Sequence, residues 1–200
     1  LRATRCYQAG FAMESPMPAS VPLRTFTPFR LGPIELRNRI VKCGTNEGMS
    51  RGGLMTDALI DWHREFAAGG VAMTTLAYCS VSADGRTFAD QLWMRDEALP
   101  GLRRFTDAIH AEGARAAIQL GHAGWFATPS VIRAKPLGPS RTFSPRGLCF
   151  SRAASEADLD RLEQEFAAAA RRAVDAGFDG IEVHIGHGYL LAQFLSPYNN

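Results

Sequence analysis

Residues 155–185, SEADLDRLEQEFAAAARRAVDAGFDGIEVHI, decide the fold, because they join a helical pattern to a short apolar strand. Ser155 is a candidate N-cap, and Asp158 stands three residues later, at the position of the acidic partner in a capping box. Gly177 follows the last residue of the amphipathic period and predicts the end of the helix. The apolar run IEVHI after Gly180 predicts a strand.

The same unit, a helical pattern followed by a glycine and a short apolar run, occurs twice more upstream. The apolar runs are VAMTTLA after Gly70 and ARAAIQL after Gly113. The helical patterns before them cover residues 56–70 and about residues 101–112. The sequence therefore predicts three helix–strand units in a row.

A fourth strand, RIVKCG at residues 39–44, precedes the first helix, so strands and helices alternate throughout. Short apolar strands that alternate with amphipathic helices predict right-handed βαβ units and a parallel sheet. Before them, FTPFRLGPIELRNR at residues 26–39 predicts a hairpin with its turn at residues 31–33. We expect this hairpin to cover the lower end of the sheet.

Two architectures share this alternation, the doubly wound open sheet and the eight-stranded barrel. A dinucleotide-binding open sheet carries GxGxxG after its first strand, and GTNEGMSRGG at residues 44–53 does not match it. The segment at residues 121–154 contains prolines and no periodicity, which is typical of long loops at the carboxyl end of a barrel. We therefore predict an α/β fold of the (β/α)8 TIM barrel class, with about the first four βα units present.

Composition and charge narrow the functional class. The chain is 46% hydrophobic and 21% charged, and 22 basic against 20 acidic residues give a formal net charge of +2. One globular domain is expected, without the basic runs that track nucleic acid or an anionic membrane. The four cysteines form no CxxC pair, which fits reduced thiols in a cytoplasmic protein. Residues 1–20 are expected to be a disordered leader before a barrel part at residues 21–200.

Polar side chains gather at the predicted carboxyl ends of the strands, where barrel enzymes place their chemistry. In strand order they are Thr45, Asn46 and Glu47, then Tyr78, then Gln119 and His122, and finally His184, His187 and Tyr189. Gln119 and His122 are also consistent with core residues that satisfy neighbouring hydrogen-bonding groups, and a lone buried histidine is more often such a residue than a catalyst.

The end of the last strand, GIEVHIGHGYL, predicts a small reactive cluster. His184 and His187 are separated by a bend that we expect at Gly186, so two imidazole N–H groups can face one carbonyl oxygen. Tyr189 supplies a phenol that can donate a proton from the same side. Zinc or iron ligation is the main alternative, although the first strand lacks the histidine pair usual in metal barrels.

The segment HIGHGYLLAQFLSPYNN at residues 184–200 resembles the hallmark segment of the old yellow enzyme family, the NADH:flavin oxidoreductases or ene-reductases. Supporting segments occur in order at residues 26–41 (FTPFRLGPIELRNRIV), 118–124 (IQLGHAG) and 167–184 (AAAARRAVDAGFDGIEVH). The resemblance extends over residues 22–200.

The resemblance implies an FMN-containing barrel in which NADH or NADPH reduces the flavin and a carbonyl-activated alkene is the small-molecule substrate. It implies that His184 and His187 bind the substrate oxygen and that Tyr189 protonates the α-carbon. The implied flavin contacts are Cys43, Gly44, Thr45, Asn46, Tyr78 and Gln119. It implies no metal, and it leaves open a homo-oligomer of the complete protein.

Several positions depart from the common family pattern. Relatives often carry Pro-Met and then Thr or Cys where this chain has residues 44–46, and Glu-Ala where it has Ala77 and Tyr78. Trp125 replaces a frequent arginine. Relatives also continue past Asn200, and barrel phosphate sites usually follow the last two strands. We therefore expect an N-terminal half that binds FMN poorly alone and aggregates. A non-catalytic barrel fragment and a metal-dependent lyase or hydrolase are the alternatives.

Overall fold

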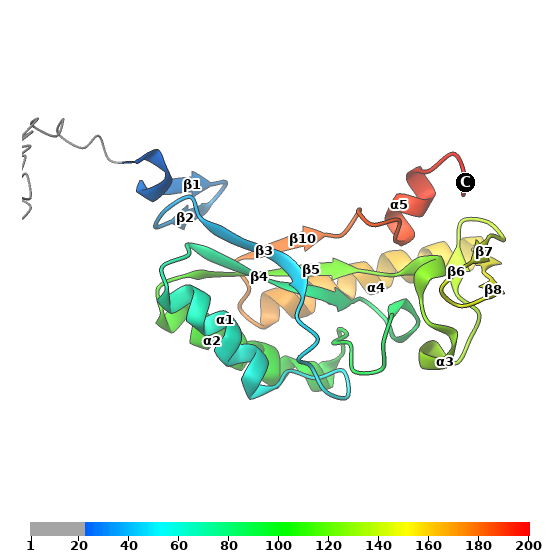
Figure 1. Ribbon diagram of the computed structural model, residues 1–200, viewed down its shortest axis with the longest axis horizontal. Coiled ribbons are helices and arrows are strands. Elements are labelled where there is room, and N and C mark those ends of the chain that lie inside the picture. Colours follow the sequence, from blue (N-terminus) through cyan, green and yellow to red (C-terminus); the bar gives the residue numbers. More distant parts are fainter. Residues whose placement is uncertain (1–22) are drawn as a thin grey trace, which may run out of the picture.

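A computed structural model describes residues 23–200, so the leader predicted at residues 1–20 lies outside the described part. Its central feature is a four-stranded parallel sheet (Figure 1). The strands are β3 (Val41–Asn46), β4 (Met73–Ser80), β5 (Arg115–Gly121) and β10 (Gly180–Val183). Their spatial order, β10-β5-β4-β3, follows the order of the chain without a reversal.

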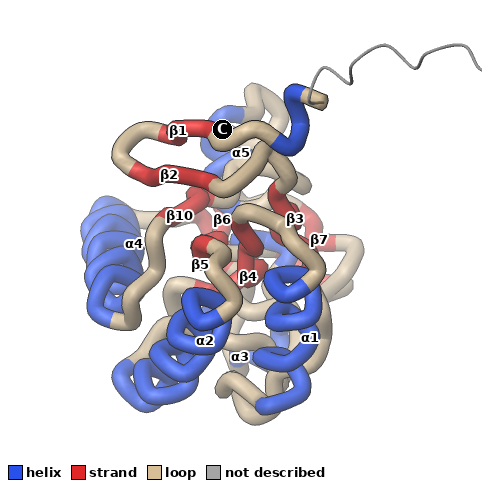
Figure 2. Tube along the Cα trace, turned by 90° about the vertical axis from the view of Figure 1, so that its left-hand side faces the viewer, coloured by secondary structure: helices blue, strands red, loops and turns tan. Residues whose placement is uncertain are grey.

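Three helices connect consecutive strands of this sheet: α1 (Asp57–Ala68), α2 (Leu99–Ala111) and α4 (Glu156–Asp175). Figure 2 shows the strands in an arc, with all three helices on its outer side. A doubly wound sheet reverses its strand order and carries helices on both faces. The unreversed order and the single helical layer are those of part of a barrel, which confirms the predicted fold class.

Local sequence signals fix the ends of the helices. The Thr56 hydroxyl accepts a hydrogen bond from the Leu59 amide at 3.2 Å, and Ser155 and Asp158 form the predicted capping box. After α4, Gly177 takes a φ of +87°, a left-handed conformation that other residues rarely adopt. Within residues 23–200, no helix combines the length and the apolar character that crossing a membrane requires.

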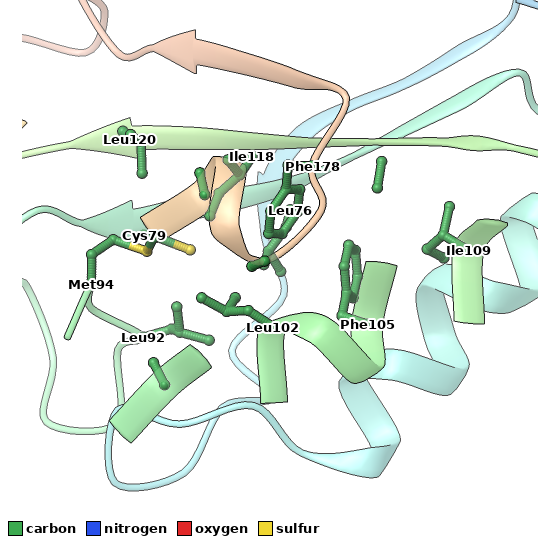
Figure 3. Close-up of a cluster of buried hydrophobic side chains, with 14 of the residues drawn as sticks. Leu76, Cys79, Leu92, Met94, Leu102, Phe105, Ile109, Ile118, Leu120 and Phe178 are labelled. Atoms are coloured by element: carbon green, nitrogen blue, oxygen red, sulfur yellow. The ribbon is translucent and has the colours of Figure 1, made fainter. Parts of the chain in front are cut away.

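The main hydrophobic core lies between the sheet and the helices (Figure 3). Phe105 of α2 is fully buried, and its ring stacks on that of Phe178 at a centroid distance of 5.7 Å. The labelled members of this core in Figure 3 are Leu76, Cys79, Leu92, Met94, Leu102, Phe105, Ile109, Ile118, Leu120 and Phe178. This packing fixes the sheet as a rigid support for its carboxyl end.

The predicted hairpin is formed by β1 (Phe29–Leu31) and β2 (Ile34–Leu36). Leu36 joins Met73 and Ala117, near the amino ends of β4 and β5, in a second apolar cluster. Arg37, just after the hairpin, donates hydrogen bonds to the backbone carbonyl oxygens of Val71 and Glu112. The hairpin therefore covers the lower end of the sheet, as the sequence predicts.

The segment at residues 121–154 contains short elements rather than one irregular loop. They are the 3-10 turn η4 (Gly124–Phe126), the helix α3 (Pro129–Ile132), and the strands β6 (Leu137–Gly138), β7 (Phe143–Ser144), β8 (Cys149–Phe150) and β9 (Arg152–Ala153). Strand β6 pairs with β9, and β7 pairs with β8. Three further 3-10 turns, η1 (Arg24–Phe26), η2 (Ala83–Gly85) and η3 (Asp96–Ala98), and the helix α5 (Leu190–Leu195) complete the described chain.

Replacing Ser155 with alanine is expected to lower the free energy of unfolding by about 1 kcal/mol, because the Asp158 amide loses its side-chain acceptor at the start of α4. Urea denaturation followed by circular dichroism measures the change. Ser155→Thr, which keeps the hydroxyl as a capping acceptor and as a donor to Asp158, is the control and should retain most of the stability. Equal stability of the alanine variant and the wild type would contradict this role.

Candidate active site

Two bulges lie near the carboxyl ends of neighbouring strands. The register between β3 and β4 shifts between Lys42 and Thr45, and that between β4 and β5 shifts between Leu76 and Cys79. A bulge inserts one extra residue and redirects the side chains around it. The residues within the two shifts are Cys43, Gly44, Ala77 and Tyr78. Three of them are flavin contacts implied by the family resemblance, so the bulges shape the predicted site.

Each of the four strands contributes one residue to a patch that we call the polar floor. Its residues, from β3 to β10, are Gly44, Ala77, Gln119 and Glu182. A Cβ atom on Gly44 would lie 2.9 Å from both Ala77 Cβ and Gln119 Nε2, so only glycine fits without displacing them. The Gln119 amide donates a hydrogen bond to the carboxylate of Glu182, its register partner across β5 and β10. Glu182 therefore contacts an amide at this end of the sheet.

The remaining predicted cofactor residues border the polar floor on an open surface. Cys43, Thr45 and Asn46 are exposed at the carboxyl end of β3. The Asn46 side-chain oxygen accepts a hydrogen bond from the Gly48 amide at 3.1 Å, which orders the turn after the strand. Hydroxyl and amide groups are thus accessible beside the polar floor.

The structure brings His184, His187, Tyr189 and Tyr78 together in one histidine–tyrosine cluster. The His184 ring centroid lies 4.9 Å from those of His187 and Tyr189, and 5.7 Å from that of Tyr78. The Tyr78 and Tyr189 ring centroids are 5.2 Å apart. The predicted cluster of two imidazoles and a phenol therefore forms, and Tyr78 packs against it from β4.

The bend within this cluster does not occur where the sequence suggested. His187 and Gly188 have left-handed φ values of +57° and +67°, whereas Gly186 does not adopt this conformation. A non-glycine residue with positive φ is uncommon, and such residues often occur at functional sites. The expected bend at Gly186 was thus wrong by one to two residues.

The two histidines form a contact with each other. The His184 Nδ1 atom accepts a hydrogen bond from the Gly186 amide at 3.1 Å, which assigns the proton of the neutral ring to Nε2. That Nε2 lies 3.0 Å from His187 Nδ1. Burial and the neighbouring His187 lower the pKa of His184 below its ordinary value. For both rings to donate to one oxygen atom, His187 must give up this contact.

The two tyrosines of the cluster are protonated phenols at neutral pH. Burial raises the pKa of Tyr189 above its ordinary value, while Arg146 and Tyr78 oppose the rise. Burial also raises the pKa of Tyr78. The Tyr78 hydroxyl donates to the Gly85 carbonyl oxygen at 3.1 Å and lies 3.4 Å from the Gln91 side-chain oxygen. The Tyr189 hydroxyl therefore carries a proton that it can donate, whereas the Tyr78 hydroxyl is already hydrogen-bonded.

His122 is buried in a separate hydrogen-bond network. Its Nδ1 accepts from the Gly124 amide at 2.9 Å, and its Nε2 lies 3.4 Å from Asp84, which also pairs with Arg161 at 2.9 Å. Both ring nitrogens thus have protein partners. This arrangement corresponds to the structural alternative that the sequence left open for His122.

Two buried glutamines support the site and were missed by sequence reasoning. The Gln193 amide donates to the carbonyl oxygens of Ala123 and Gly188, the latter at 2.6 Å, which ties the bend after His187 to the end of β5. Gln91 accepts from the Thr87 amide at 2.7 Å behind Tyr78. Gln193 lies within the segment that carries the family resemblance, whereas no pattern around Gln91 marks it.

In the part of the chain that the structure describes, no three or more His, Cys, Asp or Glu side chains gather in a way that could hold a metal ion. The alternative of a metal-dependent barrel thus has no candidate ligand group within residues 23–200.

Residues 24–200 match the sequence profile of the NADH:flavin oxidoreductase / NADH oxidase family. The chain belongs to this family. Its curated relatives include oxidoreductases of several names. The 4,4'-dithiodibutanoate disulfide reductase of Rhodococcus erythropolis is 55% identical over 172 residues, which is 86% of this chain and 43% of the relative.

Two further relatives are each 35% identical over 88% of this chain. They are a metal reductase of Desulforamulus reducens, of which 26% is covered, and an NADPH dehydrogenase of Listeria innocua, of which 52% is covered. The chain therefore spans about half or less of the length of these relatives.

Solved structures of the NADH:flavin oxidoreductase type share the fold. A 2-naphthoyl-CoA reductase in complex with 2-naphthoyl-CoA superposes with a TM-score of 0.84 at 26% identity, covering 88% of this chain and 29% of that one. The old yellow enzyme homologue of Zymomonas mobilis gives a TM-score of 0.83 at 24% identity, covering 89% and 53%. These similarities show that the sheet and its helices have the fold of part of such a barrel.

Membership in this family implies FMN and a nicotinamide nucleotide as cofactors. The polar floor fits a planar ring with polar edges. Gly44 provides a flat surface where a side chain would collide with Ala77 and Gln119, and the neighbouring Thr45 and Asn46 are exposed. The amide of Gln119 and the hydroxyl of Thr45 are suitable partners for the carbonyl and N–H groups of such a ring.

The pH dependence of stability tests the environment of His184. Because its pKa is lowered in the folded state, the unfolded chain binds this proton more readily. The contribution of His184 to stability should be complete above about pH 6.5 and should be lost as the pH falls through the folded pKa.

Unfolding free energies measured between pH 8 and pH 5 should therefore fall less steeply in His184→Gln than in the wild type. An NMR titration should place the His184 midpoint below about 6.5. A midpoint above that value would show that the ring is not held in its neutral form.

Proposed function

We propose that this chain is the N-terminal half of an FMN-dependent NAD(P)H oxidoreductase that reduces alkenes activated by a carbonyl group. The observation that carries this proposal is the histidine–tyrosine cluster at the carboxyl end of a parallel sheet, beside the polar floor. Two imidazoles and a protonated phenol lie within 4.9 to 6.1 Å of one another, measured between ring centroids. The imidazoles can donate hydrogen bonds to a substrate oxygen that gains negative charge, and the phenol can donate a proton to a substrate carbon.

Bound FMN would supply the hydride chemistry that links NADH or NADPH to the alkene. The residues that would hold its ring system are Cys43, Gly44, Thr45, Asn46, Tyr78 and Gln119. Their positions around the two bulges support this assignment, because the bulges and the polar floor belong to the same end of the sheet.

His184 and His187 would bind the carbonyl oxygen of the substrate. The neutral His184 ring carries its proton on Nε2, which points toward His187 and becomes available when that contact opens. Each donor to an oxygen that gains negative charge contributes about 3 kcal/mol of transition-state stabilisation in comparable sites. Positioning the alkene by its carbonyl also determines which carbon lies next to Tyr189.

Tyr189 would donate the proton to the α-carbon. Its raised pKa keeps the phenol protonated at neutral pH, so Tyr189 holds its proton before each turnover. Arg146 and Tyr78 oppose the rise in the pKa of Tyr189, so they would stabilise the phenolate that remains after transfer. Solvent at the open side of the cluster can then return the proton.

A second candidate reaction is the reduction of a disulfide to two thiols. The 55% identical relative named 4,4'-dithiodibutanoate disulfide reductase supports it. The stoichiometry matches that of alkene reduction, because one hydride equivalent and one proton convert RSSR into two RSH. The proton demand differs, however, because a thiol has a pKa of about 8.5 and its thiolate can leave without an acid.

Tyr189→Phe in the complete protein should lower the rate of alkene reduction by about 10²- to 10⁴-fold, because general acid catalysis is lost. Reduction of the bound flavin by NAD(P)H, followed by its absorbance in stopped flow, should be unchanged. Tyr198→Phe is the matched control, since this tyrosine is 83% exposed. Undiminished alkene reduction in Tyr189→Phe would remove the proton-donor assignment.

The same variant separates the two candidate substrates. With a disulfide as oxidant, Tyr189→Phe should lose less than about tenfold in rate, since a thiolate leaves without a proton donor. Steady-state rates with an α,β-unsaturated ketone and with a dialkyl disulfide provide the comparison in wild type and variant. A wild-type protein that turns over the disulfide but not the ketone would make disulfide reduction the function.

A further inference from the structure

A buried ionic network lies behind the carboxyl end of β3, between that strand and α1. Lys42 and Glu47 form an ion pair whose side chains are only 8% and 3% exposed. The Lys42 ammonium group also donates to the Thr75 carbonyl oxygen at 3.3 Å and lies 4.6 Å from the centre of the Trp62 ring. Every group around the ammonium therefore belongs to β3, β4, α1 or the turn after β3.

The network extends from Glu47 through α1 to the next strand. The His63 Nε2 atom lies 3.2 Å from the Glu47 carboxylate, and His63 Nδ1 lies 2.7 Å from the Thr74 hydroxyl. Burial lowers the pKa of His63, so the ring is neutral and the buried set contains one positive and one negative charge. Burial alone would raise the pKa of Glu47, but contacts with His63 and Lys42 hold it below the ordinary value.

Stability alone does not account for this network. Taking two charges out of water is costly, and well-packed apolar side chains in their place are often neutral or stabilising. Buried ionic groups can instead specify one arrangement of the backbone over another. The position of the pair along the chain indicates which arrangement is selected here.

Lys42 and Glu47 flank the bulged segment at residues 43–46. In a regular strand, residues five apart are separated by about 16 Å along the chain and point to opposite faces of the sheet. The two side chains meet across the register shift between Lys42 and Thr45 and the turn after Asn46. The ion pair therefore joins the two ends of the bulged segment and restrains the backbone between them.

We propose that Lys42 and Glu47, which lie beside His63, are positioning residues that keep the bulged segment at residues 43–46 in the shape that receives the FMN ring. This inference rests on the proposed flavin contacts of that segment. In a slip to the regular register, side chains would change faces. Gly44 would then leave its place against Ala77 and Gln119.

Three variants of the complete protein test this role by flavin binding, measured as quenching of FMN fluorescence on titration with apoprotein. Glu47→Gln should weaken FMN binding at least tenfold, because the uncharged amide no longer retains Lys42. The double variant Lys42→Met/Glu47→Leu removes both charges and should restore the thermal unfolding midpoint to that of the wild type. Its FMN affinity should stay at least tenfold lower, because an apolar pair does not select the bulge.

Asp61→Asn is the control, since Asp61 forms an exposed ion pair with Arg64 within α1 and should alter neither quantity. If the double variant regains both stability and wild-type FMN affinity, the network is purely structural and the positioning role is overturned. That result leaves the proposed function intact when Tyr189→Phe still loses alkene reduction. A wild-type protein that does not bind FMN overturns both proposals.

Discussion

The packing of α1, α2 and α4 on one face of the parallel sheet is the interaction on which the rest of the structure depends. Each helix returns the chain to the same lower end, so every strand runs upward and terminates at the same edge. Phe105, Leu102 and Ile109 of α2 are fully buried in this layer. Residues distant in sequence, such as Tyr78 and His184, meet across Gly121 of β5, because all the strands end at this edge and glycine has no side chain to separate them.

Irregularities at that edge give the site its shape. The bulge in β4 accompanies the placement of Tyr78 against the histidine–tyrosine cluster, and the bulge in β3 accompanies the polar floor around Gly44. Near these bulges, buried side chains that hold the loops have hydrogen-bond or ion-pair partners. Gln193 ties the bend at His187 to β5, and the Lys42–Glu47 pair spans the bulged segment of β3. The regular core is therefore apolar, whereas the irregular edge is held by hydrogen bonds and ion pairs.

Tyr78 is the largest side chain within the bulge of β4. Its ring packs against both His184 and Tyr189, at centroid distances of 5.7 Å and 5.2 Å. Gly121 on β5 makes room for it, because a Cβ atom there would lie 3.1 Å from both Tyr78 and His184. The large side chain of Tyr78 on β4 therefore fits because the neighbouring strand β5 has a glycine at position 121.

The sequence by itself determined the elements and their order. Thr56, Ser155 and Gly177 act through neighbours in the chain, so the helix ends could be predicted from local patterns, and the strands follow from short apolar runs. The family segment at residues 184–200 also indicated His184, His187 and Tyr189 in advance. Only the tertiary structure decided the two bulges, the left-handed His187, the contact between the two imidazoles and the partners of Lys42. These depend on register and on side chains from other strands. Because β4 is buried along its whole length, no alternation of apolar and polar residues marks where its register shifts.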